Sequence, residues 1–324
     1  MECEEHTMEY KGYKIQDHQS SGGGKLIRVY DVRDFNPVHI FECGQCFRWY
    51  REHDGSYTGV AKGKVANIFY DAYDYCSEHN DGHGSDKGGT LYIRNADMED
   101  FKNVWYDYLD LGRNYGDIKE ALMRKDDIMK KAVEFGYGIR LLRQDFWETL
   151  ISFIISANNR IPMIMKVVAS ISESFGKKIL INEKAYHTFP DVENLASASI
   201  EQLAVCRAGF RCKYIDITSK MVEEGCLKPS ELYLVNTDEA REMLKQLPGV
   251  GDKVADCTLL YSGIKYDVFP TDVWVKRVME ELYFHREATL KEIQKFAANY
   301  FGELAGFAQQ YLFYYARENK IGAK

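Results

Sequence analysis

The chain of 324 residues lacks any apolar run of the roughly 20 residues that a helix needs to cross a bilayer. Its first residues, MECEEHTMEYKGYK, also lack the basic start and apolar centre of a signal peptide. We therefore expect no membrane association and a cytoplasmic or nucleoid location, or a nuclear one in a eukaryote. Without an export signal, the eight cysteines are expected to be reduced thiols.

Positive charge is also scarce, because 42 Lys and Arg residues face 49 Asp and Glu residues, which gives a net charge of −7. No basic tail or low-complexity arm is present. Contacts with nucleic-acid phosphates favour Lys and Arg, so the mean charge argues weakly against nucleic-acid binding. A local surface can differ from this mean. A DNA-binding surface would have to use a limited basic patch or backbone N–H groups.

The pattern of apolar residues predicts an α+β chain of two domains after a loosely ordered lead-in at 1–24, which ends in SSGGG. Residues 25–118 begin with runs rich in Val, Ile, Tyr and Phe that are separated by short Gly- and Asp-containing turns, which indicates an antiparallel β domain. The period becomes helical from about residue 97, and residues 119–324 are predicted to form an all-helical domain. No internal repeat is found.

The segment QLPGVGDKVADC, residues 246–257, predicts a helix–hairpin–helix over 238–263, with Thr237 as the N-cap of its first helix. Gly249 and Gly251 permit positive φ or close approach of another backbone. Consecutive N–H groups of such a turn form an anion-binding nest, so we expect Gly249, Val250 and Gly251 to bind an anion such as a phosphate. The alternative is a simple connection between two helices.

Lys253 lies in the first turn of the second helix of this hairpin. The helix dipole and burial both disfavour a protonated amine there, and a neutral amine is what Schiff-base chemistry needs. Cys257 is one turn further along and shares its face. Asp272 precedes the next amphipathic helix, where it can act as an N-cap, as a catalytic carboxylate, or as both.

Several segments together resemble the 8-oxoguanine DNA glycosylases of the HhH-GPD superfamily, in the class with a small N-terminal β domain. They are RLLRQDFWETLISFIISANN, GQCFRW, AGFRCKY, LPGVGDKVADC and GFAQQYLF. The resemblance covers roughly residues 25–318. It implies an antiparallel, TATA-binding-protein-like β domain at 25–118 and an all-helical HhH-GPD catalytic domain at 119–324.

The resemblance also implies a reaction on double-stranded DNA that contains 8-oxoguanine. Glycosylases turn the target nucleotide out of the duplex, because its sugar carbon cannot be reached inside the stack. By resemblance, Lys253 attacks C1′, displaces the base and forms an imine, and β-elimination then cuts the strand on the 3′ side. Asp272 would stabilise the oxocarbenium-like charge that develops as the glycosidic bond breaks.

The same resemblance assigns residues that recognise the base. Guanine has an acceptor at N7, whereas 8-oxoguanine carries a hydrogen there and donates. The carbonyl of Gly44 would accept that hydrogen, Gln309 would read the Watson–Crick edge, and Cys257 and Phe313 would lie against the two faces of the base. Without the resemblance, Gly44 would be interpreted as a turn glycine and Phe313 as a core residue.

On the opposite strand, Asn158 would fill the space of the extruded base, Phe210 would wedge into the stack and Arg211 would bind the orphaned cytosine. Family members strict for cytosine carry a second arginine where this chain has Met163. We therefore expect weaker discrimination against other opposite bases. Trp274 stands where a histidine is common, so DNA contacts near the active site are expected to differ.

No cofactor is expected. Many relatives in the wider superfamily bind an iron–sulfur cluster through four cysteines, but no cysteine follows Cys257 in this chain. A structural monovalent or divalent cation at the hairpin is compatible with the sequence. Two further cysteine patterns are weak candidates for a metal site: Cys43 with Cys46, and Cys76 with His79 and His83. The first overlaps the base-recognition segment, and the second has loose spacing in a loop, so neither is expected to bind a metal ion. A monomer is expected, because no oligomerisation signal is found.

Two other functional classes remain as alternatives. A monofunctional glycosylase for alkylated or other bases typically lacks a lysine at position 253, so Lys253 argues against it. A non-enzymatic hairpin module or degenerate family member would not be expected to have Lys253, Asp272, Gly44 and Gln309 together.

Overall fold

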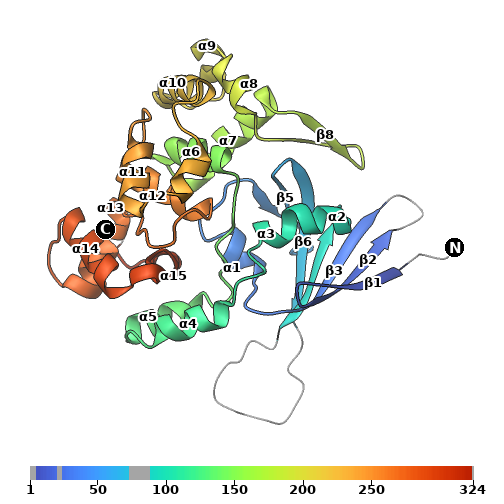
Figure 1. Cartoon of the computed structure of the whole chain (residues 1–324), viewed down its shortest axis with the longest axis horizontal. Coiled ribbons are helices and arrows are strands. Elements are labelled where there is room, and N and C mark those ends of the chain that lie inside the picture. The colour runs from blue at the N-terminus through green and yellow to red at the C-terminus, as the bar shows by residue number, and fades with distance from the viewer. Residues whose placement is uncertain (1–4, 20–23, 73–87, 323–324) are drawn as a thin grey trace, which may run out of the picture.

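The computed structural model describes residues 5–19, 24–72 and 88–322, which form a β-sheet domain and a larger helical domain (Figure 1). This confirms the predicted α+β class. Two hydrophobic cores are present, one under the sheet and one among the helices. In the described part of the chain, no helix is both long enough and apolar enough to span a bilayer.

The sheet has seven antiparallel strands in the order β1-β2-β3-β7-β6-β5-β4. Their bounds are β1 Glu5–Tyr10, β2 Tyr13–Gln19, β3 Lys25–Val32, β4 Trp49–Arg51, β5 Tyr57–Ala61, β6 Lys64–Ala72 and β7 Gly89–Arg94. Between β3 and β4, the chain forms the short helix α1 (Pro37–Phe41) and a loop that reaches the helical domain. After β7, the turns α2 (Met98–Asp100), η1 (Phe101–Trp105) and α3 (Tyr106–Tyr108) pack on the core of the sheet.

The prediction of a loosely ordered lead-in was wrong for residues 5–19, which form the hairpin β1–β2. Lys11 and Gly12 both have positive φ, at 48° and 86°, which is the conformation of a tight hairpin turn that matches strand twist. Ile15 is fully buried and pairs with Val29 of β3. The hairpin therefore belongs to the sheet and its core, although SSGGG follows it directly.

The second domain contains long helices joined by short turns. The elements are α4 Tyr115–Met123, α5 Asp127–Phe135, α6 Phe146–Ser156, α7 Ile161–Phe175, α8 Val192–Ala196, α9 Ile200–Val205, α10 Arg211–Glu223, η2 Pro229–Tyr233, α11 Thr237–Lys245, α12 Asp252–Tyr261, α13 Val273–Met279, η3 Glu280–Phe284, α14 Leu290–Tyr300, η4 Gly302–Leu304 and α15 Ala305–Glu318. A two-stranded hairpin, β8 (Lys178–Ile181) and β9 (Lys184–His187), lies between α7 and α8 and adds strands to the predicted helical domain.

The change from one core to the other falls a few residues before the predicted boundary at 118. Leu111 still packs in the core under the sheet, whereas Tyr115, Ile118 and Leu122 of α4 pack in the helical core. Helix α4 starts at Tyr115 because Asn114 caps it, and its side chain accepts from two N–H groups of the first turn. The apolar face of α4 is thus used by the second domain.

Arg140 joins the two domains. Its guanidinium is buried and donates to the carbonyls of Asp34 at 2.9 Å, Asp110 at 2.7 Å and Arg33 at 2.8 Å, and it lies 4.6 Å from the ring centre of Tyr115. The acceptors belong to two segments of the sheet domain, the loop after β3 and the turn after α3. One cation therefore satisfies buried carbonyls from two loops and fixes the segment that leads into α6.

We predict that Arg140→Met lowers the free energy of unfolding by about 3 kcal/mol, because the buried carbonyls lose a charged donor that no apolar side chain replaces. Urea denaturation followed by circular dichroism measures the change. Arg124→Met is the matched control, since that arginine is exposed and its ion pair among the described residues is with Glu120, one turn away. A loss no larger than that of the control would contradict the role given to Arg140.

Candidate active site

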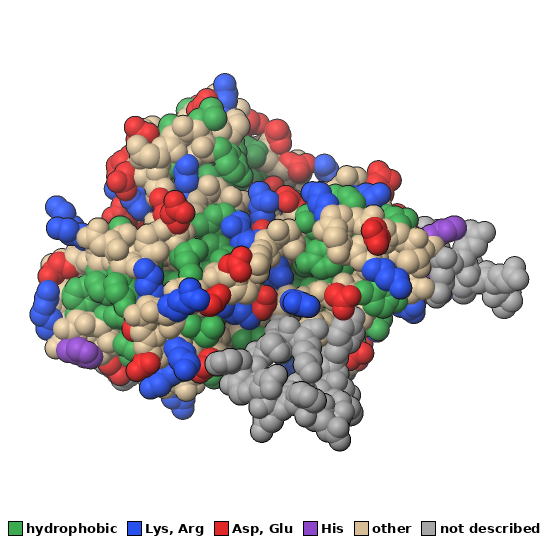
Figure 2. Space-filling model, turned by 60° about the horizontal axis from the view of Figure 1, so that its bottom comes forward, with side chains coloured by type: hydrophobic (Ala, Val, Ile, Leu, Met, Phe, Trp, Pro, Cys, Tyr) green, Lys and Arg blue, Asp and Glu red, His purple; other side chains and the backbone are tan. Residues whose placement is uncertain are grey.

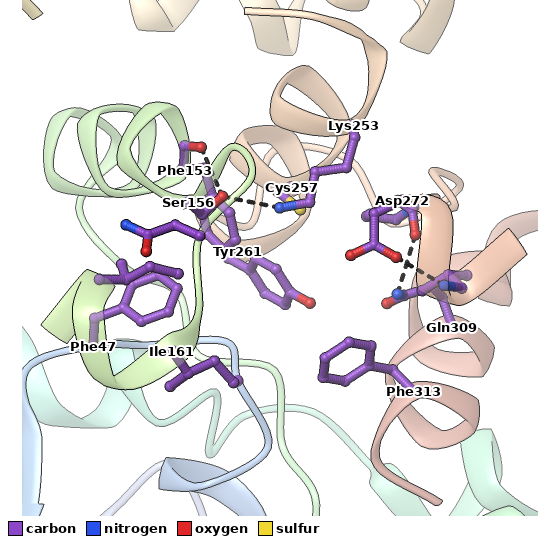
Figure 3. A pocket seen from close by; sticks show the side chains of 15 residues that line it. Phe47, Phe153, Ser156, Ile161, Lys253, Cys257, Tyr261, Asp272, Gln309 and Phe313 are labelled. Carbon is purple, nitrogen blue, oxygen red and sulfur yellow. Dashed lines mark hydrogen bonds between the residues drawn. The ribbon is translucent and has the colours of Figure 1, made fainter. Parts of the chain in front are cut away.

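A pocket opens between α6, α7, α12, α13 and α15, next to the loop that follows α1 (Figure 3). Its walls combine residues that are far apart in the sequence. The side chains predicted for the chemistry and for base recognition meet here: Lys253, Cys257, Asp272, Gln309, Phe313 and the backbone of Gly44.

Lys253 is half-buried in the first turn of α12, whose N-cap Gly251 has extended backbone and offers no side-chain cap. The Nζ atom donates to the Oγ atom of Ser156 at 3.0 Å and lies 4.9 Å from the ring centre of Phe153. The hydroxyl of Ser156 donates its own hydrogen to the carbonyl of Phe153 at 2.7 Å. Because its own hydrogen is used in this bond, Ser156 can only accept a hydrogen bond from the amine. It donates no hydrogen bond to an unshared electron pair on Nζ, so such a pair stays available for reaction.

Asp272 is the N-cap of α13, as the sequence predicted, and its Oδ1 accepts from the N–H of Val275 at 2.7 Å. The carboxylate lies across the pocket from Ser156, on the side of Gln309 (Figure 3). A capping bond holds one oxygen in place. The negative charge of the group is thus fixed at the wall opposite α6.

Cys257 lies one turn after Lys253 and is buried in the pocket wall. Burial raises the pKa of its thiol to about 12, and the nearby lysine offsets this only in part. The thiol is therefore neutral at physiological pH. It offers an apolar, polarizable surface and no negative charge.

Gln309 and Phe313 project from one face of α15 into the pocket. The Nε2 atom of Gln309 donates to the carbonyl of Pro270 at 3.1 Å, which fixes the amide. Its Oε1 atom is buried and has no hydrogen-bond partner among the described residues. A buried acceptor without a partner is costly, so this oxygen indicates where a ligand N–H group would bind.

Gly44 lies in the loop after α1 and has φ of +90°. A Cβ atom there would lie 3.1 Å from the ring of Phe313 and 3.5 Å from both Ile161 and Arg317. Positive φ together with this contact restricts the position to glycine. The backbone of Gly44 can therefore come close to anything that lies against Phe313.

The helix–hairpin–helix consists of α11, a turn and α12. The N-cap of α11 is Asn236, which forms a capping box with Glu239, so the prediction of Thr237 was wrong by one residue. Gly249 has φ of +83°, and a Cβ there would lie 2.8 Å from the ring of Tyr214. Gly251 has open space around it, whereas the side chain of Val250 is buried. The N–H of Val250 donates to the carbonyl of Leu247 at 3.2 Å, so a ligand that bound this group would have to displace that bond.

Asn158, Phe210 and Arg211 lie close together outside this pocket. Asn158 is exposed and has φ of +50°, and Phe210 is 60% exposed. The guanidinium of Arg211 is largely buried, lies 4.4 Å from the ring centre of Phe210 and donates to the carbonyls of Ala157 and Asn158 at 3.0 Å each. Arg211 therefore supports the loop of Asn158, and contact with a base would require exchange of these bonds.

The two positions where the chain departs from the family pattern flank the site. Met163 is 44% exposed in the first turn of α7. Trp274 is half-buried and packs edge-to-face on Phe313, with ring centres 5.1 Å apart. On the face seen in Figure 2, basic and acidic side chains are interspersed. This agrees with the similar numbers of basic and acidic residues in the chain, 42 and 49.

The described residues contain no group of three His, Cys, Asp or Glu side chains that could hold a metal ion. Cys43 and Cys46 are both buried, and their thiols donate to the carbonyls of Ile40 and Phe41. The other cysteine–histidine pattern, at 76–83, lies outside the described residues. A cation at the hairpin stays a prediction.

Sequence reasoning missed three residues whose side chains complete the site. Ser156 accepts from Lys253, Tyr261 lines the pocket, and Gln310 is buried behind it. Their partners are distant in the sequence, so no local pattern indicates them. The pair of glutamines in GFAQQY, within an otherwise apolar helix, was the one available signal, because a buried amide needs partners.

We predict that Asp272→Ala lowers the free energy of unfolding by about 1 kcal/mol, whereas Asp272→Asn, which keeps the capping oxygen, changes it much less. The urea denaturation midpoint of each variant measures this, and Thr289→Ala, at the N-cap of α14, gives the reference loss for a capping residue in the same domain. Equal losses in Asp272→Ala and Asp272→Asn would show that the cap does not stabilise α13.

Comparisons with known proteins identify relatives of both parts of the chain. Residues 28–150 match the family described as 8-oxoguanine DNA glycosylase, N-terminal domain, and residues 151–302 match the HhH-GPD superfamily of base excision DNA repair proteins. The structure of MBOgg1 in complex with a low-affinity DNA ligand is 46% identical, with a TM-score of 0.84 over 98% of this chain and 99% of that chain.

Two further relatives have informative names. The Clostridium acetobutylicum 8-oxoguanine glycosylase/lyase, solved with double-stranded DNA containing cytosine opposite 8-oxoguanine, is 46% identical, with a TM-score of 0.83 over 91% of this chain and 96% of that chain. The N-glycosylase/DNA lyase OGG1 of Arabidopsis thaliana is 30% identical over 84% of this chain and 75% of its own length.

Proposed function

The chain belongs to the HhH-GPD superfamily of base excision DNA repair proteins, in the group with an 8-oxoguanine DNA glycosylase N-terminal domain. From this premise, we propose that it excises 8-oxoguanine from duplex DNA and then cleaves the strand at that site. The observation that supports this most strongly is the meeting of an amine, a carboxylate and a buried acceptor without a partner in one pocket, on Lys253, Asp272 and Gln309.

Lys253 is the nucleophile in this proposal. Its amine attacks C1′ of the extruded nucleotide, while the glycosidic bond breaks and its electron pair leaves with the base, which takes up a proton. Opening of the sugar ring gives an imine between Nζ and C1′. Loss of a C2′ proton then expels the 3′ phosphate, and hydrolysis releases the lysine. Ser156 supports this role, because it binds the amine only as an acceptor.

Asp272 stabilises the positive charge that develops on the sugar as the base departs. The carboxylate is fixed by its capping bond to Val275, so little reorganisation accompanies the reaction. Asp272 and Lys253 both line the pocket and lie near each other at its rim in Figure 3, which suits a sugar bound against both of them. The cap and the catalytic role thus use the same fixed geometry.

The base lies between Cys257 and Phe313 in this proposal. Its N7 hydrogen is accepted by the carbonyl of Gly44, and the Oε1 atom of Gln309 accepts from the Watson–Crick edge, where guanine derivatives have N–H donors. The neutral thiol of Cys257 suits contact with the face of a base. Guanine would instead direct a lone pair of N7 at the carbonyl of Gly44, which is repulsive.

The hairpin and the exposed loops bind the rest of the duplex. Backbone N–H groups of Gly249 and Gly251 receive a phosphate, which needs no excess of basic side chains, and that of Val250 joins them by exchanging its bond to the carbonyl of Leu247. Asn158 and Phe210 are exposed on adjacent loops, as residues that enter a base stack must be. Arg211 reads the orphaned base after exchanging its bonds to the carbonyls of Ala157 and Asn158. DNA is thus the expected partner despite the net negative charge.

We predict that borohydride traps wild-type protein covalently on a duplex with one 8-oxoguanine, and that Lys253→Gln reduces the adduct by at least about 100-fold because the attacking amine is absent. A duplex with guanine at that position should give no adduct, and Lys220→Gln, on α10 away from the pocket, should trap like wild type. Trapping of Lys253→Gln at the wild-type level would refute the assignment of the nucleophile.

We also predict that the wild-type protein removes 8-oxoguanine at comparable rates opposite cytosine and at least one other base. Met163→Arg should raise the preference for cytosine about 10-fold, since an arginine placed on a base edge adds discrimination of this order. Single-turnover excision opposite each of the four bases measures it, with Met163→Leu as the control for loss of the thioether. Strict cytosine dependence in wild type would contradict the expectation.

A further inference from the structure

Gln310 is the neighbour of Gln309 on α15 but has a different environment. Its side chain is fully buried behind the pocket. The Nε2 atom donates to the carbonyl of Cys43 at 3.1 Å, and the Oε1 atom accepts from the hydroxyl of Tyr261 at 2.7 Å. Both ends of the amide are therefore used, and the amide connects α12 with the loop that contains Gly44.

Tyr261 is the donor that orients this amide. It is the last residue of α12, the helix that begins next to Lys253, and its ring stacks on Phe153 at 5.2 Å. Burial raises the pKa of Tyr261 well above its ordinary value, so the hydroxyl keeps its hydrogen. Because that hydrogen goes to Oε1 of Gln310, the NH₂ group of the amide must face Cys43.

The bond to Cys43 acts directly on the position of Gly44. The carbonyl of Cys43 belongs to the peptide group that precedes Gly44, whose own positive φ and missing side chain leave it few local restraints. Arg317 of α15 holds the preceding carbonyl, that of Glu42, at 2.6 Å. On the other side, Gln45 accepts from the N–H of Leu142 at 2.8 Å. Gly44 thus lies between residues 42–43, whose carbonyls are hydrogen-bonded, and Gln45, whose side chain is hydrogen-bonded.

We propose that Tyr261 and Gln310 form a hydrogen-bond relay that positions the carbonyl of Gly44 and so sets the selectivity for a base with a hydrogen at N7. The inference rests on the proposed function and adds two positioning residues to it. A hydrogen bond weakens steeply when its angle or distance departs from the optimum. Loss of the relay lets the Gly44 peptide rotate, which weakens the bond to N7–H and also relieves the repulsion of guanine.

The test compares binding of 8-oxoguanine and guanine duplexes in the Lys253→Gln background, which leaves the base in place. Tyr261→Phe should lower the ratio of the two affinities about fivefold, the effect of one lost hydrogen bond. Gln310→Met should lower it at least as much. The double variant should lower this affinity ratio no more than Gln310→Met alone does, because the effects of substitutions within one hydrogen-bond network are not additive.

Two controls separate positioning from general damage. Tyr115→Phe also removes a buried hydroxyl, one that donates to Asp110 and accepts from Leu141 away from the pocket, and it should leave selectivity unchanged. With Lys253 restored, borohydride trapping of Tyr261→Phe and Gln310→Met on an abasic-site duplex should fall by a smaller factor than their selectivity, since that substrate has no base to recognise.

Unchanged selectivity in Tyr261→Phe and Gln310→Met would overturn the relay, as would additive losses in the double variant or an equal loss in Tyr115→Phe. In each of these cases, the proposed function would still stand if the wild-type protein prefers 8-oxoguanine over guanine and is trapped on the abasic-site duplex. A wild-type protein with neither behaviour would overturn the proposed function itself.

Discussion

Buried hydrogen bonds between side chains and backbone groups at the junction of the two domains are the constraint on which the site depends. Arg140 satisfies carbonyls of the sheet domain, Gln45 receives the N–H of Leu142, and Gln310 donates to Cys43. Each of these donors or acceptors would be costly to leave unsatisfied, so the two domains have one relative position that meets all of them. The loop of Gly44 is held at that position, against a pocket built by the other domain.

The polar groups in the pocket differ in whether the protein itself supplies their hydrogen-bond partners. The amine of Lys253 has an acceptor in Ser156, the carboxylate of Asp272 has a backbone donor, and the thiol of Cys257 is neutral. The Oε1 atom of Gln309 is the buried oxygen here without a partner among the described residues. The groups proposed to carry out the reaction are therefore held by hydrogen bonds. The group proposed to bind the base, by contrast, still has an acceptor without a partner.

Local sequence patterns predicted the elements that hold the site, because capping and helical periodicity are local. Helix α12 begins at Asp252, Asp272 caps α13, and Gln309 and Phe313 share a face of α15. The β1–β2 hairpin was missed because SSGGG outweighed the turn at Lys11–Gly12. Ser156 and Tyr261 could not be predicted, since each acts through a partner distant in the sequence, and the glutamine pair was the one local signal for Gln310. The roles proposed for the site residues are still predictions.

The most direct test of the account is a crystal structure of Lys253→Gln bound to a duplex that contains one 8-oxoguanine. We expect the extruded base between Cys257 and Phe313, with N7 about 2.7–3.2 Å from the carbonyl oxygen of Gly44 and the Oε1 atom of Gln309 bonded to its Watson–Crick edge. A base bound elsewhere, or one in this pocket whose N7 makes no contact with Gly44, would contradict it.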